Sequence, residues 1–180
     1  RDVAVTGVQT CALPIFPPKA KGLQRPSVGH SGFVNDCIPV FNEGFPAFCA
    51  ERARSLSETK DDPWLVGHFS DNELLPPVLD KYLSLDPADP AQAPNRQAAV
   101  AWLTARKGQA AVPSSEITSQ DRAAFMGYVF ETYFRIASEA IRKADPNHLY
   151  LGSRLHSREK ENPYVLRAAG KYCDVIAINY

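Results

Sequence analysis

The feature that most constrains this chain is an alternation between amphipathic stretches with helical periodicity and short apolar runs typical of buried strands. The apolar runs lie at 64–69, 148–152 and 174–180. The helical patterns cover about 42–56, 95–107, 119–144 and 162–172. Such alternation is typical of a parallel sheet whose strands are joined by helical crossovers. The sequence therefore predicts an α/β fold. Three strands cannot close a barrel, so we expect a piece of something larger.

The residues at the segment boundaries predict where the helices begin and end. Asn42 can cap the first helix, and Gly108 is placed to stop the second. Ser119 or Asp121 is expected to cap the longest helix, over about 119–144. Asn162, followed by a proline, opens the last helix. These boundaries leave a long irregular excursion after the strand at 64–69, and long loops in compact domains are usually functional.

Composition excludes several kinds of partner and cofactor. The 180 residues carry 20 basic and 20 acidic side chains, which leaves no charge footprint for nucleic acid or an anionic membrane. No apolar run approaches the ~20 residues of a membrane span. The cysteines, Cys11, Cys37, Cys49 and Cys173, show neither CxxC pairing nor metal-ligand spacing, so we expect inert thiols and no metal site. We also expect no cofactor.

The first residues are expected to lie outside the fold. The stretch from Val5 to Ile15 resembles the translation of a common sequencing adapter. We therefore treat 1–16 as an artefact and 17–180 as one fragment of a domain. With the true amino terminus missing, the lack of a leader segment says nothing about localisation.

Each of the three predicted strands ends in polar side chains that suit a binding site. They are Asp71, Asn72 and Glu73 after the first strand, Arg154 and His156 after the second, and Asn179 and Tyr180 at the third. The carboxyl ends of parallel strands meet at one edge, where α/β proteins build their sites. Carboxyl, amide and guanidinium groups suit a hydroxyl-rich ligand. Strict alternation would place Asn72 and Glu73 on opposite faces, so the strand must end or bulge there.

Three sequence segments, at 61–74, 145–154 and 172–180, resemble the catalytic domain of clan A retaining glycoside hydrolases of the β-agarase type. The Asn72-Glu73 pair is similar to the signature that ends strand four in that clan. The resemblance covers roughly 36–180. It implies a partial (β/α)8 TIM barrel running from about helix 3 through strand 6.

The resemblance also implies roles for individual residues. Glu73 would be the general acid/base, and Asn72 would bind a sugar hydroxyl in a galactan or agarose-like polysaccharide. Asp71, Arg154, His156, Asn179 and Tyr180 would contact substrate, and Tyr180 would also border the nucleophile. That nucleophile, a second glutamate, would end strand seven, beyond this chain. Because a retaining mechanism needs two carboxyl groups about 5 Å apart, the fragment alone is expected to be inactive. An agarase-like enzyme would be secreted or periplasmic.

Plainer alternatives stay open for these residues. Glu73 could be a solvated loop acid, and Arg154 could be a structural ion-pair partner. His68 and His156 are more often structural than catalytic in such contexts. A barrel that binds carbohydrate without cleaving it would keep the same rim. A doubly wound nucleotide-binding domain is disfavoured, because no GxGxxG or P-loop pattern occurs.

Overall fold

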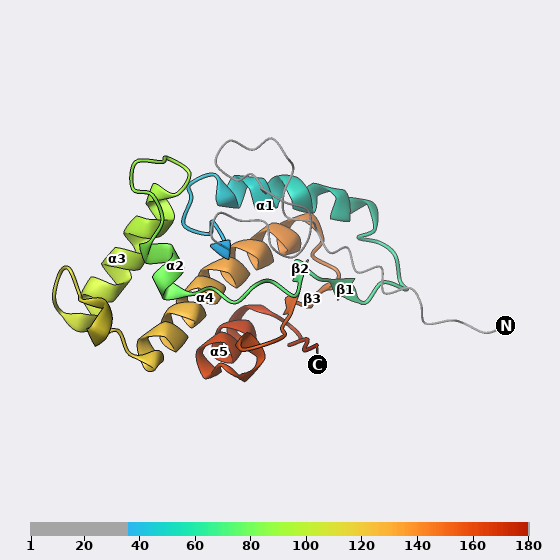
Figure 1. Ribbon diagram of the computed structural model, residues 1–180. Helices are drawn as coiled ribbons and strands as arrows, with labels where there is room; N and C mark the ends of the chain where they lie inside the picture. The colour runs from blue at the N-terminus through green and yellow to red at the C-terminus, as the bar shows by residue number, and fades with distance from the viewer. Residues whose placement is uncertain (1–35, 180) are drawn as a thin grey trace.

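The computed structural model describes residues 36–179 (Figure 1). The adapter-like segment 1–16, Cys11 and Tyr180 lie outside the described residues.

Helices make up most of the described part. The α-helices are α1 (Phe45–Ala53), α2 (Leu79–Leu83), α3 (Ala93–Lys107), α4 (Ser119–Ala144) and α5 (Pro163–Tyr172). Short 3-10 turns are η2 (Arg54–Glu58), η3 (Ser114–Glu116) and η4 (Glu159–Glu161). The strands are β1 (Gly67–His68), β2 (Asp71–Asn72), β3 (Leu149–Tyr150) and β4 (Ser153–Arg154).

The strands pair in parallel, as the alternating sequence predicts. β1 pairs with β3 and β2 with β4, and Ser70 N donates to Gly152 O between the two pairs at 2.9 Å. The segments 67–72 and 149–154 therefore form one interrupted parallel pair. Gly152 adopts φ 70°, in the left-handed region that glycine tolerates best, and so breaks the ladder at this point.

The predicted strand at 174–180 is much shorter than expected. Within the described residues it reduces to one parallel bridge, Leu155 with Ile178. Asn179 N donates to Leu155 O at 2.7 Å. At the start of the segment, the side chain of Asp174 accepts a hydrogen bond from Tyr150 N at 2.8 Å. Asp174 N in turn donates to Tyr150 O at 2.9 Å, so side chain and backbone of Asp174 both bind Tyr150, and strand-like pairing is limited to the bridge at Leu155.

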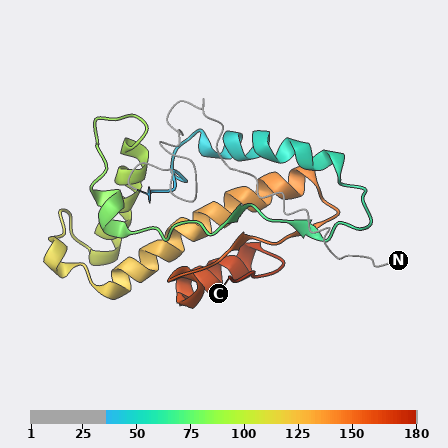
Figure 2. The ribbon, with the colours of Figure 1, turned by 45° about the vertical axis from the view of Figure 1, so that its right-hand side comes forward.

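Helix α4 organises the core and has the bounds that the sequence predicts. It crosses the molecule with α1 on one side and α5 on the other (Figures 1 and 2). Its aromatic side chains at 125, 130, 133 and 134 are completely buried. A Cβ added to Gly127 would lie 2.3 Å from the Cβ of Tyr164, so only glycine permits the close approach of α4 and α5.

The helix ends partly follow the predictions. Gly108 ends α3 with φ 69°, and Asn162 caps α5 by accepting from Tyr164 N. The cap of α4 is Thr118 and not Ser119 or Asp121, because Thr118 and Asp121 exchange side-chain and backbone hydrogen bonds in a capping box. Asn42 accepts from Gly44 N at 2.9 Å, so it forms the turn before α1 and does not cap the helix itself.

No helix in the described range 36–179 is long and apolar enough to cross a membrane. Three cysteines in this range are free thiols: Cys37, Cys49 and Cys173. Burial raises the pKa of each thiol to about 12, which makes the reactive thiolate scarce near neutral pH. This agrees with the inert role that the sequence predicts for them.

Candidate functional site

The polar strand ends meet at one edge of the parallel array. In the register of β2 and β4, Asp71 lies beside Ser153 and Asn72 beside Arg154. The bridge between Leu155 and Ile178 then brings Asn179 to the same edge. The structure thus gathers the tips of three segments that are far apart in sequence.

Glu73 stands at the centre of this edge. Strand β2 ends at Asn72, and Glu73 itself adopts φ 52°, a left-handed conformation that is uncommon for a residue with a side chain. Its backbone N donates to Arg154 O at 3.2 Å, and its Oε1 accepts a hydrogen bond from Asn179 Nδ2 at 2.6 Å. The strand therefore ends between Asn72 and Glu73. This is the break that the sequence analysis requires if both side chains are to reach one site. Left-handed residues outside glycine cost about 1–2 kcal/mol and cluster at functional sites.

Asp71 and Arg154 lie close to Glu73. Asp71 is 8 % exposed, and its Oδ1 accepts from Asn72 N at 2.7 Å. The Arg154 guanidinium lies over the ring of Phe69, 5.3 Å from its centroid. Among residues 36–179, no carboxylate forms an ion pair with Arg154, and its buried Nε has no hydrogen-bond partner. A structural ion-pair role for Arg154 therefore has no support in the described part.

His156 faces a different group. Its Nδ1 lies 2.6 Å from Oε1 of Glu159, and its backbone N donates to the same oxygen at 3.1 Å. Glu159 is buried in η4, and burial raises the pKa of its carboxyl group even though the hydrogen bonds it accepts act in the opposite direction. The contact joins the loop after β4 to η4, so the structure gives His156 a local structural partner.

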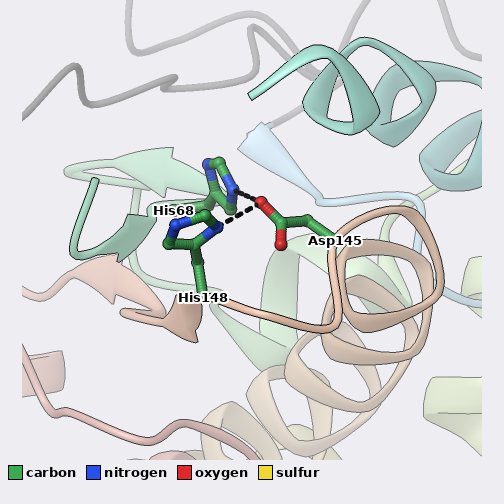
Figure 3. Close-up of side chains that lie close together, drawn as sticks. All are labelled: His68, Asp145 and His148. Atoms are coloured by element: carbon green, nitrogen blue, oxygen red, sulfur yellow. Dashed lines mark hydrogen bonds and ion pairs between the residues drawn. The ribbon is translucent and has the colours of Figure 1, made fainter. Parts of the chain in front are cut away.

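A second polar cluster, which the sequence analysis did not identify, joins His68 in β1 to the turn between α4 and β3 (Figure 3). His68 Nε2 and His148 Nδ1 both donate to Oδ2 of Asp145, each at 2.7 Å. His68 and Asp145 are buried, and Asp145 follows the end of α4. The Asp145-Pro-Asn-His148 spacing in the sequence could have indicated part of this cluster. His68, expected to be structural, is structural here.

The contacts of His148 favour its charged form. Nε2 of His148 lies 2.9 Å from the carbonyl oxygen of Asp62, and neither that oxygen nor the Asp145 carboxylate can donate. Both contacts are therefore hydrogen bonds only while both ring nitrogens carry a proton. Burial lowers the pKa of His148, but the bonds to Asp62 and Asp145 outweigh it and raise that pKa overall. Burial alone would raise the pKa of Asp145, but the hydrogen bonds from His68 and His148 lower it overall.

The three side chains are held together by hydrogen bonds, at separations shorter than those between the ligands of a bound zinc ion. A zinc ion holds its ligands at about 2.0–2.2 Å, which separates the ligand atoms from each other by more than ~3 Å. Here each nitrogen lies 2.7 Å from the carboxylate oxygen. The imidazolium of His148 thus ties the loop before β1 to the turn between α4 and β3.

We expect this tie to make stability depend on pH. Because the folded pKa of His148 lies above its usual value of 6.5, its contribution is complete below that value and is lost as pH rises through the folded pKa. The lowered pKa of Asp145 adds a contribution that is lost only in acid. Urea unfolding of the chain and of His148→Gln, from about pH 5 to pH 9, measures the effect. The stability deficit of the variant should shrink as pH rises; a constant deficit would contradict a charged His148.

Comparisons with solved structures identify proteins that share this fold. The chain superimposes on the crystal structure of the protein BpGH50 with a TM-score of 0.67 and 38 % sequence identity, covering 78 % of this chain. It matches an exo-β-agarase with a TM-score of 0.58 and 27 % identity over 79 % of the chain. The agarase AgWH50C matches with a TM-score of 0.59 and 29 % identity, also over 79 % of the chain. Neither a family model nor a curated protein matches.

The matched region is only part of those proteins. It covers 32 % of BpGH50, 24 % of the exo-β-agarase and 22 % of AgWH50C. The described chain therefore has the fold of a part of glycoside hydrolases of the GH50 agarase type, and these are its structural neighbours.

Proposed function

We propose that this chain is part of a retaining glycoside hydrolase that cleaves an agarose-like polysaccharide, with Glu73 as the general acid/base. The observation that carries the proposal is the placement of Glu73. Its carboxyl group lies at the carboxyl end of a parallel strand, in a left-handed residue, hydrogen-bonded to Asn179 from another strand tip. The likeness to two agarase structures supports the choice of substrate.

We further propose that the fragment belongs to a (β/α)8 barrel. The parallel segments and the helical crossovers between them support this architecture. So do the large apolar side chains that flank the strands and remain exposed, among them Trp64 at 84 % and Ile178 at 54 %. Parallel sheets are normally covered on both faces, so these side chains indicate surfaces that further elements would bury. In such barrels the carboxyl ends of the strands carry the active site.

The chemistry assigned to Glu73 has two steps. The protonated carboxyl group gives its proton to the glycosidic oxygen as the bond to the anomeric carbon breaks, and the resulting carboxylate then removes a proton from the attacking water. Asn72 and Arg154, adjacent in register, are placed to bind sugar hydroxyls, with Asp71 beside them. A second carboxylate, about 5 Å from the first, must act as nucleophile. This part of the protein is therefore inactive by itself under the proposal.

A direct test uses the full-length protein with agarose as substrate. We expect release of oligosaccharides, and ¹H NMR recorded during the first minutes should show the β-anomer as the initial product, before mutarotation. Porphyran, cellulose and xylan serve as comparison substrates. Binding of agarose without hydrolysis would support a carbohydrate-binding barrel instead, and an initial α-anomer would exclude the retaining mechanism.

A further inference from the structure

The contact between Asn179 and Glu73 is fixed from both sides by backbone hydrogen bonds. The two residues lie 106 positions apart, with Asn179 Nδ2 2.6 Å from Glu73 Oε1. Asn179 N donates to Leu155 O at 2.7 Å, and Glu73 N donates to Arg154 O at 3.2 Å. The consecutive residues Arg154 and Leu155 thus hold Glu73 and Asn179 in place through their carbonyl oxygens. The side-chain contact follows from this register.

The chemistry of the two groups makes their bond directional. The amide nitrogen of asparagine donates and does not accept, whereas an ionised carboxylate only accepts. A hydrogen bond donated to a carboxylate favours its charged form and so lowers its pKa. When the carboxyl group is protonated, Oε1 keeps the acceptor role, and Oε2 is the favoured position of the proton.

We propose that Asn179 is a positioning residue for Glu73: its amide holds the carboxyl group in one orientation, stabilises the carboxylate and directs the acidic proton to Oε2. The sequence instead predicts that Asn179 contacts substrate. The positioning role of Asn179 rests on the acid/base function proposed for Glu73. The hydrogen bond and its effect on the titration of Glu73 do not depend on that function.

The test is a titration of Glu73 by ¹³C NMR in the 180-residue chain labelled at the glutamate carboxyl carbons. The signal that disappears in Glu73→Gln identifies the residue. In Asn179→Ala the donor is lost, and we expect the pKa of Glu73 to be higher by about 0.5–1 unit. Asn179→Asp has the same shape but replaces the donor with a second carboxyl group, so the pKa of Glu73 should be higher still.

Asn147→Ala is the matched control. Asn147 donates to Lys60 O, near the opposite ends of the strands, and its loss should leave the titration of Glu73 unchanged. If Asn179→Ala does not fold, the comparison of Asn179→Asp with the unsubstituted chain decides. Equal pKa values for Glu73 with and without the Asn179 amide would overturn the proposal.

A kinetic measurement separates this inference from the proposed function. In the full-length enzyme, Asn179→Ala should move the alkaline limb of the kcat/KM profile to higher pH by the amount seen in the titration. If the titration shows the expected order but the protein hydrolyses no glycan, the proposed function fails and the contact of Asn179 with Glu73 stands. If hydrolysis occurs and the titration shows no change, the assignment of Asn179 fails alone.

Discussion

Replacing Glu73 with glutamine in the full-length protein is expected to lower kcat/KM for agarose by about 10²–10⁴-fold. Glutamine keeps the shape of the side chain and an oxygen that can accept from Asn179 Nδ2, the bond seen at 2.6 Å. It cannot give a proton to the departing sugar oxygen. Initial rates on agarose oligosaccharides measure the loss, which falls on the step where the glycosidic bond breaks.

The leaving group makes this prediction specific to acid catalysis. An aryl glycoside with a dinitrophenolate leaving group needs no proton, so its kcat/KM should change by less than about tenfold in Glu73→Gln. Its kcat should fall because the second step lacks a base, and added azide, which attacks without one, should restore turnover. Glu58→Gln, at an exposed glutamate at the end of η2, is the matched control and should behave like the unsubstituted protein. Equal losses on both substrates would contradict the acid/base role.

Replacing Asp145 with alanine is expected to lower the free energy of unfolding by about 3–5 kcal/mol, the usual cost of removing one partner from a buried ion pair. Asp145 is fully buried, and its Oδ2 accepts from both His68 and His148. Its loss leaves the imidazolium of His148 without a counter-ion and one donor of His68 without an acceptor. Urea unfolding near pH 6 measures the change, because at this pH the contribution of charged His148 is complete.

Two controls identify the cause of that loss. Glu139→Ala breaks an exposed ion pair with Arg135 on the same helix and should cost no more than about 0.5 kcal/mol. In a chain that already carries His148→Ala, the further change Asp145→Ala should cost distinctly less than it does alone, because no buried cation remains. Additive losses in the double variant would show that the two side chains act independently.

Local patterns were sufficient for the helices that bury one regular stripe. The apolar period of 119–144 predicts α4 with its observed bounds, because a stripe recurring at helical spacing can be buried only by a helix in that register. Gly108 and Asn162 likewise mark helix ends through their own backbone and side-chain chemistry. The cap at Thr118 was missed, since Thr118, Ser119 and Asp121 offer similar capping groups and only geometry selects among them.

The strand at 174–180 shows where local patterns were insufficient. Its apolar residues suit a strand, yet the carboxylate of Asp174 accepts from Tyr150 N, and strand pairing in the described residues is limited to one bridge. The candidate site shows the same division. The sequence indicated Glu73 as an acid at a strand end, whereas its left-handed backbone and its contact with Asn179 follow from the register of three segments.

By itself the sequence determined the α/β alternation, the long central helix and the polar character of the strand ends, all of which depend on residues within a few positions of one another. Only the tertiary structure decided that Asn179 contacts Glu73 and that His68 contacts Asp145, across 106 and 77 positions. Periodicity and capping act along the chain, where the sequence records them. Side-chain partners at such separations are selected by strand register and helix packing, which no short stretch of sequence contains.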